Sequence, residues 1–540
     1  MQIVRSLALL FLLMTSFPVM AADGSHPKLV VAISVDQFSA DVFTEYRQHF
    51  RGGFKRLLSQ GVVFPSGYQG HAATETCPGH STILTGARPM RTGIIANSWY
   101  DLSTKRSDKL IYCAEDENRP GTDSTNYIAS PVHLRVATLG DRMKKADRRT
   151  RIVAVAGKDR SALMMAGGQA DQIWWWGGQK FVTLGGRASN AVAEKANAAA
   201  TARLATPQPP IDLPQPCGER NYAVQAGSRT VGTGRFARAA GDAKSFRASP
   251  ELDSSTLALA AGFRDALKLG EGTQTDLLII GASATDYVGH AYGTQGTEMC
   301  GQLMTLDRNL GEFFDSLDSA GIDYLVVLTA DHGGHDLPER SVTNGAPSAK
   351  RVDVALNAET IGKAIGTRLG LEDQLLYADG PNGDYYVSRL ISETERRVVA
   401  NEAATMLKAH PQVVAVFSRD ELAAAPMPKG PPDSWPLLER ARASFDAQRS
   451  GDLVVMLKPW VTPIAIPKTS VATHGSPWDY DRRVPILFWR KGIRPFEQPL
   501  AVETADIMPT LATQIGLAVP SEEIDGRCLD LIAGEGDSCR

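Results

Sequence analysis

The stretch LVVAISVD, residues 29–36, decides the fold, because seven residues suited to a buried strand lead directly to the carboxylate of Asp36. Three further runs repeat the pattern: residues 152–156 (IVAVA), 276–281 (DLLIIG) and 324–328 (YLVVL). Continuous apolar runs of this length, separated by helical stretches, are typical of strands buried on both faces of a parallel sheet. We therefore predict an α/β fold with a largely parallel central sheet and helices on both faces.

Each run is followed by residues that can hold a metal ion or a phosphate. Besides Asp36, these are Lys158-Asp159-Arg160 after the second run, Asp286 and His290 after the third, and Asp331-His332 after the fourth. Ligands of parallel sheets bind outside the carboxyl ends of the strands. We expect these carboxylates, imidazoles and cations to meet in one crevice.

The remaining sequence fits one catalytic domain, residues 22–540, that carries two inserted segments. Helical periodicity marks residues 41–60, 132–145, 257–267 and 301–316, and the core resumes at residues 484–489 and 504–511. The first insertion, at about residues 170–250, begins with the Trp174–Trp176 run and continues into Ala-rich and Pro-rich sequence. The second spans about residues 340–470. Such insertions are where substrate selectivity would be adjusted.

The first 21 residues have the pattern of a signal peptide. Arg5 precedes an apolar stretch at residues 7–14, and Val19-Met20-Ala21 precedes a cleavage site at Ala22. That stretch is too short to span a bilayer, and no later run of about eighteen apolar residues follows. We predict a periplasmic or secreted protein without a stable membrane anchor. A retained N-terminal anchor is the alternative.

The composition is that of a large globular protein, with 540 residues of which 43% are hydrophobic. Lys and Arg number 57 against 60 Asp and Glu, a net charge of -3. No global positive field would recruit nucleic acid or an anionic membrane, so any affinity for phosphate must be local. We expect small-molecule ligands, no nucleic-acid partner and a monomer.

Six cysteines form an even set in a chain that we expect to be exported: Cys77, Cys113, Cys217, Cys300, Cys528 and Cys539. This favours disulfides over free thiols. Proximity suggests pairing Cys528 with Cys539, Cys77 with Cys113, and Cys217 with Cys300. Sequence does not choose among the fifteen connectivities, and one or two pairs staying reduced is the alternative.

The sequence most similar to a catalytic turn is TETCPGHST, residues 74–82. Pro78 fits the first turn of a helix, which places Thr76 at the helix N-terminus, where unpaired N–H groups favour an alkoxide or a phosphate oxygen. A threonine hydroxyl is otherwise a poor nucleophile, and metal coordination would activate it. Taken alone, a Thr in this position is more often a helix cap.

Three histidine positions strengthen the case for metal. Asp286 and His290 are four residues apart and fall on one side of a helical turn, so they can chelate one cation, although this pattern is common. Asp331-His332 is followed by Gly333 and Gly334, which leave room for close approach of an ion. His474 adds an imidazole in a late turn.

Together these residues resemble the alkaline phosphatase superfamily. Its motifs occur here in family order: Asp36, Thr76-Cys77-Pro78-Gly79-His80, Asn97, Lys158-Asp159-Arg160, Asp286 and His290, Asp331-His332-Gly333, and His474-Gly475. The chain is most similar to the phosphate-irrepressible bacterial monoesterases, over nearly the whole mature sequence. The resemblance implies an alkaline-phosphatase-like sandwich.

The resemblance also implies two zinc ions. One would be bound by Asp36, Asp331 and His332 with Thr76, and the other by Asp286, His290 and His474. Thr76 would attack phosphorus to give a phosphothreonine intermediate, and the products would be an alcohol and inorganic phosphate. Lys158, Arg160 and Asn97 would contact the phosphate. Two added cations suit the doubly charged phosphoryl group of a monoester better than a diester.

Alternatives remain. A nucleotide pyrophosphatase or phosphodiesterase would use the same zinc ions and Thr76, and a non-catalytic exported binding protein would need no nucleophile. Read alone, Lys158-Asp159-Arg160 is a solvated charged turn. We find no ligands for a third, magnesium ion, and the sulfatase motif Cys-x-Pro-x-Arg is absent. His80 is assigned to packing or bracing of the nucleophile turn, and His335 to packing or support of the ligand pair beside it.

Overall fold

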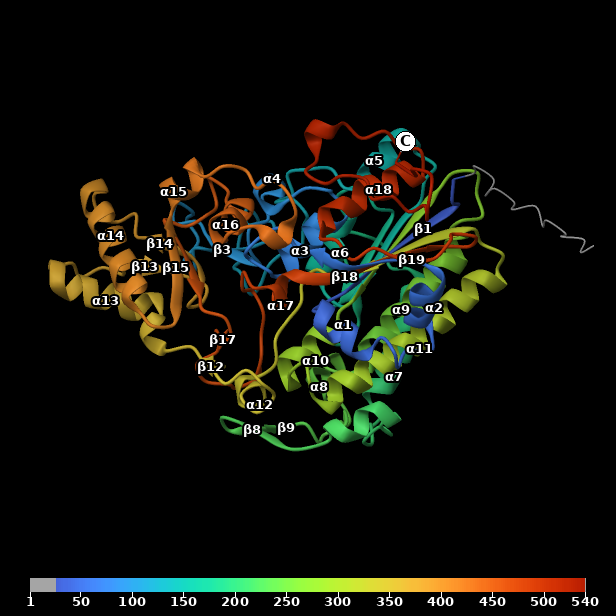
Figure 1. Ribbon diagram of the computed structural model, residues 1–540, viewed down its shortest axis with the longest axis horizontal. Helices are drawn as coiled ribbons and strands as arrows, with labels where there is room; N and C mark the ends of the chain where they lie inside the picture. Colours follow the sequence, from blue (N-terminus) through green and yellow to red (C-terminus); the bar gives the residue numbers. More distant parts are fainter. Residues whose placement is uncertain (1–25, 540) are drawn as a thin grey trace, which may run out of the picture.

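The computed structural model describes residues 26–539, and within this range a ten-stranded sheet forms the centre of the molecule (Figure 1). Its strand order is β19-β2-β18-β11-β1-β10-β5-β6-β7, with β20 paired to β2. The middle is parallel: β1 (Leu29–Val35) lies between β10 (Asp276–Ala282) and β11 (Tyr324–Thr329), and β10 pairs with β5 (Ile152–Ala156). The four predicted strands and the largely parallel sheet are confirmed.

Toward its two edges the sheet also contains antiparallel strands. The antiparallel strand β18 (Arg483–Arg490) joins β11 to β2 (Val62–Tyr68), and β2 pairs with β19 (Phe496–Glu497) and β20 (Val502–Glu503). On the other side, β5 pairs with β6 (Gln172–Trp176), which pairs with β7 (Phe181–Thr183).

The predicted start of the first insertion, at about residue 170, is therefore wrong. The Trp174–Trp176 run is strand β6 of the main sheet. Trp174 and Trp176 pack into the core on one face and Trp175 into the core on the other. Three consecutive tryptophans are thus buried on alternating faces, as in an inner strand, and the chain leaves the sheet only after residue 183.

Helices cover both faces of the sheet, as predicted (Figure 1). Alternating β1 side chains show this, because Val31 and Ile33 belong to one apolar core and Val30 and Ala32 to the other. The first core contacts α1 (Ala40–Tyr46), α2 (Gly53–Gln60), α9 (Pro250–Leu267), α10 (Ala284–Tyr292) and α11 (Thr297–Ser319). The second contacts α3 (Thr76–Ile83), α5 (Leu139–Ala146), α6 (Asp159–Ala166) and α18 (Ile507–Gln514).

All four predicted helices have different bounds: α9 and α11 extend beyond the predicted residues 257–267 and 301–316, and the other two are broken or shorter. Residues 41–60 form two helices, α1 and α2, because Asp307 on α11 accepts hydrogen bonds from the backbone N–H groups of Arg51, Gly52 and Phe54. A Cβ atom on Gly52 would lie 2.2 Å from the Asp307 carbonyl oxygen, so the break needs glycine. The predicted helix at residues 132–145 begins only at Leu139, where Thr138 and Asp141 form a capping box.

Much of the region 340–470 forms a second, smaller sheet at the left of Figure 1. Its order is β13 (Leu376–Tyr377), β14 (Gly383–Val387), β16 (Leu453–Leu457) and β15 (Val413–Ser418), and it packs with α13 (Ala358–Leu369) and α14 (Glu393–Ala409) around its own apolar core.

The other helices are α4 (Pro89–Thr92), α7 (Ala191–Leu204), α8 (Ala243–Arg247), α12 (Pro338–Ser341), α15 (Arg419–Ala424), α16 (Leu437–Ser444) and α17 (Asp479–Arg482). Strands β3 (Ser98–Tyr100) and β4 (Leu110–Tyr112), β8 (Val224–Ala226) and β9 (Arg229–Val231), and β12 (Lys350–Arg351) and β17 (Val461–Thr462) pair with each other.

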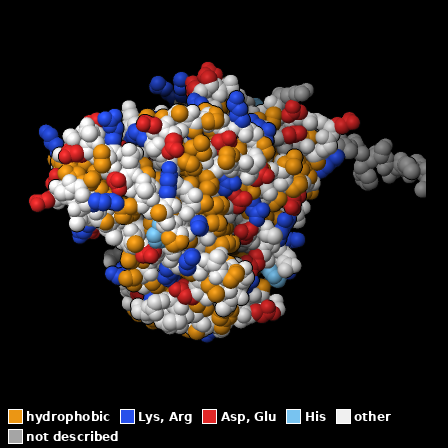
Figure 2. All heavy atoms as spheres, turned by 60° about the vertical axis from the view of Figure 1, so that its left-hand side comes forward, with side chains coloured by type: hydrophobic (Ala, Val, Ile, Leu, Met, Phe, Trp, Pro, Cys, Tyr) orange, Lys and Arg blue, Asp and Glu red, His pale blue; other side chains and the backbone are white. Residues whose placement is uncertain are grey.

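All six cysteines lie in the described part of the chain and are paired: Cys77 with Cys113, Cys217 with Cys300, and Cys528 with Cys539. No helix between residues 26 and 539 is long and apolar enough to cross a membrane. The predicted signal peptide lies outside the described residues. On the face shown in Figure 2, basic and acidic side chains are interspersed.

Candidate active site

The parallel register brings the predicted site residues to one edge of the sheet. Asp36 directly follows β1, Lys158 lies two residues after β5, and Asp331 lies two residues after β11. Asp286 lies in α10, the helix after β10. The Nζ atom of Lys158 is 2.6 Å from an oxygen of Asp36 and 2.6 Å from an oxygen of Asp286. Residues more than 100 positions apart therefore meet at the strand ends, as the sequence predicted.

The first carboxylate–imidazole group consists of Asp36, Asp331 and His332, all buried. The Nε2 atom of His332 is 3.2 Å from Oδ2 of Asp331 and 3.5 Å from Oδ1 of Asp36. Oδ1 of Asp331 accepts hydrogen bonds from the backbone N–H groups of Gln37 and His332. Its Oδ2 therefore faces the imidazole.

The second group surrounds Asp286. Its Oδ1 atom is 3.3 Å from Nε2 of His290 and 3.4 Å from Nε2 of His474. The rings of His332 and His474 stack with centroids 3.7 Å apart, so the two groups adjoin. Asp286, His332 and His474 also form a group whose ligand atoms all lie within 4.8 Å of one another. His290 contacts Asp286 but lies outside that group.

The donor atoms fit divalent cations. The Nδ1 atoms of His332, His290 and His474 lie 2.8, 2.9 and 2.8 Å from backbone carbonyl oxygens. A carbonyl only accepts, so each Nδ1 carries a hydrogen, and in the neutral ring each Nε2 presents a lone pair toward the carboxylates. Among the described residues, Nε2 of His332, Oδ1 of Asp36 and Oδ1 of Asp286 make no hydrogen bond. Facing lone pairs repel unless a cation lies between them, and nitrogen with carboxylate oxygen is a donor set that suits zinc.

The charges of the site also favour a bound cation. Burial, with the nearby Asp331 carboxylate, raises the pKa of Asp36 well above its usual value. Burial lowers the pKa of His332 to about 3, which keeps this imidazole neutral and able to bind metal. Burial opposes the charge of Lys158, but Asp286 and Asp36 outweigh it and raise the pKa of the ammonium. Lys158 thus stays charged between two carboxylates.

Thr76 begins helix α3 and is 1% exposed, with its Oγ1 atom 3.4 Å from Nζ of Lys158. Gly79 allows α3 to lie against the end of β11, because a Cβ atom there would be 2.0 Å from the Asp331 carbonyl oxygen. His80 braces this contact: its Nδ1 atom is 2.8 Å from the Thr76 carbonyl oxygen and 3.1 Å from Oδ2 of Asp331. The Nε2 atom of His335 contacts the Thr462 hydroxyl at 2.9 Å.

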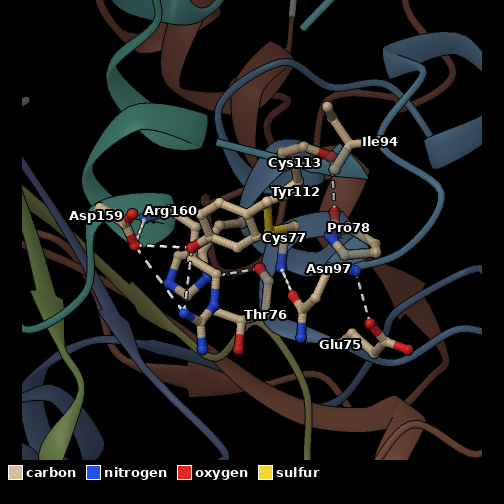
Figure 3. Close-up of a disulfide and its surroundings, with 12 residues drawn as sticks. Glu75, Thr76, Cys77, Pro78, Ile94, Asn97, Tyr112, Cys113, Asp159 and Arg160 are labelled. Carbon is tan, nitrogen blue, oxygen red and sulfur yellow. Dashed lines mark hydrogen bonds and ion pairs between the residues drawn. A yellow bond between two sulfur atoms is a disulfide. The ribbon is translucent and has the colours of Figure 1, made fainter. Parts of the chain in front are cut away.

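The other predicted phosphate contacts flank Thr76 (Figure 3). Oδ1 of Asn97 accepts a hydrogen bond from the Cys77 backbone N–H at 2.8 Å. Arg160, in the first turn of α6, places Nη1 3.3 Å from the Tyr112 hydroxyl. Tyr112 itself donates to Asp159 at 2.8 Å. Sequence reasoning missed Tyr112, whose only signal was its place next to Cys113.

Comparison with known proteins agrees with this geometry. Residues 30–477 match the family described as type I phosphodiesterase / nucleotide pyrophosphatase. The chain is 59% identical over 522 residues to alkaline phosphatase PhoK of a Sphingomonas species, which covers 96% of this chain and 93% of that protein. It is 49% identical over 520 residues to alkaline phosphatase PhoD of Zymomonas mobilis, which covers 95% of this chain and 90% of that protein.

Among solved structures, the crystal structure of wild-type alkaline phosphatase PafA superposes with a TM-score of 0.81 at 26% identity, covering 94% of this chain and 99% of that chain. The murine ectonucleotide pyrophosphatase / phosphodiesterase 5, at 14% identity and a TM-score of 0.51, shares the fold. The chain belongs to the type I phosphodiesterase / nucleotide pyrophosphatase family, within the alkaline phosphatase superfamily.

Proposed function

We propose that the protein is an alkaline phosphatase that hydrolyses phosphate monoesters to an alcohol and inorganic phosphate, with Thr76 as the nucleophile. One observation carries the proposal: the buried Thr76 hydroxyl, two adjoining carboxylate–imidazole groups and the Lys158 ammonium meet at one edge of the sheet. The likeness to alkaline phosphatases over more than nine-tenths of the chain supports the same conclusion.

Two divalent ions complete the proposed site, and we assign them as zinc. Asp36, Asp331 and His332 with Thr76 would hold one ion, and Asp286, His290 and His474 the other. When bound, such a pair supplies an activated hydroxyl nucleophile and neutralises charge on the leaving and attacking oxygens. His290 contacts Asp286 at 3.3 Å, and its ring lies beside that of His474, with centroids 5.1 Å apart.

The proposed reaction consists of two displacements at phosphorus. Oγ1 of Thr76 loses its proton and forms a bond to phosphorus while the bond from phosphorus to the ester oxygen breaks; the ester oxygen takes up a proton and leaves as the alcohol, and a phosphothreonine remains. Water then attacks the same phosphorus and loses a proton, the bond to Oγ1 breaks, Oγ1 takes up a proton, and phosphate leaves.

Three donors favour monoesters over diesters. Lys158 and Arg160 carry positive charge. The Asn97 side-chain oxygen accepts a hydrogen bond from the Cys77 N–H, so its amide nitrogen is left to donate to a phosphate oxygen. A transferred monoester group spreads two charges over three oxygens, whereas a diester replaces one of them with an ester group. The second candidate, a nucleotide pyrophosphatase or phosphodiesterase, draws support from the family description.

We further propose that the protein is exported and acts in the periplasm or outside the cell, as a monomer. The three disulfides support an oxidising compartment. Small-molecule phosphate monoesters would be its ligands.

A rate comparison tests the function. Purified protein is assayed with an aryl phosphate and the matching bis-aryl phosphate, and kcat/KM is measured for each. The proposal expects the monoester to be the better substrate by at least about a hundredfold, because the diester makes less use of the two added cations. Faster turnover of the diester would establish the phosphodiesterase instead.

A further inference from the structure

The groups proposed to face phosphate come from three separate segments of the chain. Thr76 begins α3, Asn97 precedes β3, and Arg160 lies in α6. The Cys77–Cys113 disulfide lies among all three (Figure 3), and both cysteines are fully buried. Its position raises the question of what sets the distances between these groups.

Both halves of the disulfide hold Asn97. The Cys77 N–H donates to its side-chain oxygen at 2.8 Å, and the Cys113 N–H donates to its backbone carbonyl at 2.9 Å. The Asn97 N–H in turn donates to Glu75 at 2.6 Å. Since a backbone N–H can only donate, the side-chain atom facing Cys77 must be the oxygen, and the amide nitrogen is turned to the other side.

Tyr112, the residue before Cys113, forms a hydrogen bond with Arg160. The Tyr112 hydroxyl donates to Oδ1 of Asp159 at 2.8 Å and accepts from Nη1 of Arg160 at 3.3 Å. The Tyr127 hydroxyl donates to the other Asp159 oxygen at 2.5 Å. Two phenols therefore hydrogen-bond the carboxylate, and the Arg160 guanidinium forms only a long ion pair with it, at 4.0 Å. The guanidinium is oriented by a neutral hydroxyl, so its charge remains available to an anion.

We propose that Cys77, Cys113 and Tyr112 form a positioning frame that sets where Asn97 and Arg160 stand relative to the Thr76 nucleophile. The inference rests on the proposed function and extends it. Tyr112 and the disulfide are positioning residues, because they contact Arg160, Asn97 and the backbone next to Thr76 rather than the substrate. Displacing a substrate-positioning group by about 1 Å can lower a rate by about a hundredfold.

Tyr112→Phe tests the frame without opening a cavity. We expect kcat/KM for an aryl phosphate to fall about tenfold and inhibition by inorganic phosphate to weaken, with a much smaller change for a bis-aryl phosphate. In an Arg160→Ala background, Tyr112→Phe should produce no further loss, because the hydroxyl acts through that guanidinium. Tyr385→Phe is the matched control, since Tyr385 lies in the second sheet and its buried hydroxyl donates to the Leu356 carbonyl.

The disulfide is tested by replacing both Cys77 and Cys113 with Ala. The control replaces Cys528 and Cys539, whose bridge closes the C-terminal loop. Both variants should melt at lower temperature. At a temperature where circular dichroism shows both folded, only the Cys77/Cys113 variant should lose monoester turnover and phosphate inhibition.

The inference is overturned if Tyr112→Phe matches the wild type, if its loss adds fully to that of Arg160→Ala, or if monoester and diester turnover fall equally. The proposed function fails in a different way: the wild type would then prefer the diester, or Arg160→Ala itself would leave monoester turnover unchanged.

Discussion

The two halves of the active site are assembled by different means. On the metal side, Asp36, Asp286 and Asp331 stand at the ends of neighbouring parallel strands, so the register of the sheet brings them together. On the phosphate side, Asn97 comes from outside that register, and the side chains of Asn97 and Arg160 are held by contacts with Cys77 and Tyr112. The metal side is therefore part of the core, whereas the phosphate side depends on a few separable contacts. Changes to the first should abolish activity, and changes to the second should alter substrate preference.

Removing the metal should cause the largest loss of activity, because it disables the metal side of the site. Prolonged dialysis against a chelator is expected to abolish turnover of both ester classes and to lower the melting temperature, because the buried carboxylates lose their counter-charge. Adding back zinc should restore both properties. Full activity in protein shown to be free of metal would remove the distinction between the two halves.

Thr76→Ala should abolish turnover while leaving the metal side intact. We expect kcat for monoesters to fall by at least about a thousandfold, since no other hydroxyl replaces the nucleophile. Metal content, measured by elemental analysis, should stay at the wild-type value. Thr76→Ser serves as the control, because it keeps the hydroxyl and should retain substantial activity.

Replacing both Lys158 and Arg160 with Ala should sharpen the contrast between ester classes. Monoester kcat/KM is expected to fall by about a hundredfold to a thousandfold and diester kcat/KM by far less. Steady-state kinetics with the two aryl substrates measure both. Equal losses would mean that these cations do not select for the monoester.

Gly79→Ala tests the close approach of α3 to the metal side. Alanine favours a helix over glycine by about 1 kcal/mol, yet its Cβ would lie 2.0 Å from the Asp331 carbonyl oxygen. The steric term should win, so we expect a net loss of about 1–3 kcal/mol of unfolding free energy in a denaturant titration. Gly168→Ala is the control, because no atom lies within 4 Å of its Cβ position. A stabilised Gly79→Ala protein would contradict the packing described.

The same division explains what the sequence could predict. An apolar run that ends in a carboxylate reports both a buried strand and a residue at its carboxyl end, so the core strands and the meeting of Asp36, Asp286 and Asp331 were predictable. The contact of Arg160 with Tyr112 joins residues 48 positions apart through side chains alone. No periodicity marks such a contact.

Tertiary packing also overrode local patterns. The break between α1 and α2 depends on Asp307, far along the chain. The Trp174–Trp176 run resembled the start of an insertion because Ala-rich and Pro-rich sequence follows it. Its pairing with the neighbouring strands β5 and β7 makes it an inner strand. The assignment of roles to the ligands remains a proposal.

Anomalous diffraction at the zinc absorption edge, from crystals of active protein, tests the central claim most directly. We predict two peaks, one among Asp36, Asp331 and His332 beside the Thr76 hydroxyl, and one among Asp286, His290 and His474. Fully active crystals with no peak at either position, or with metal bound only elsewhere, would contradict the account.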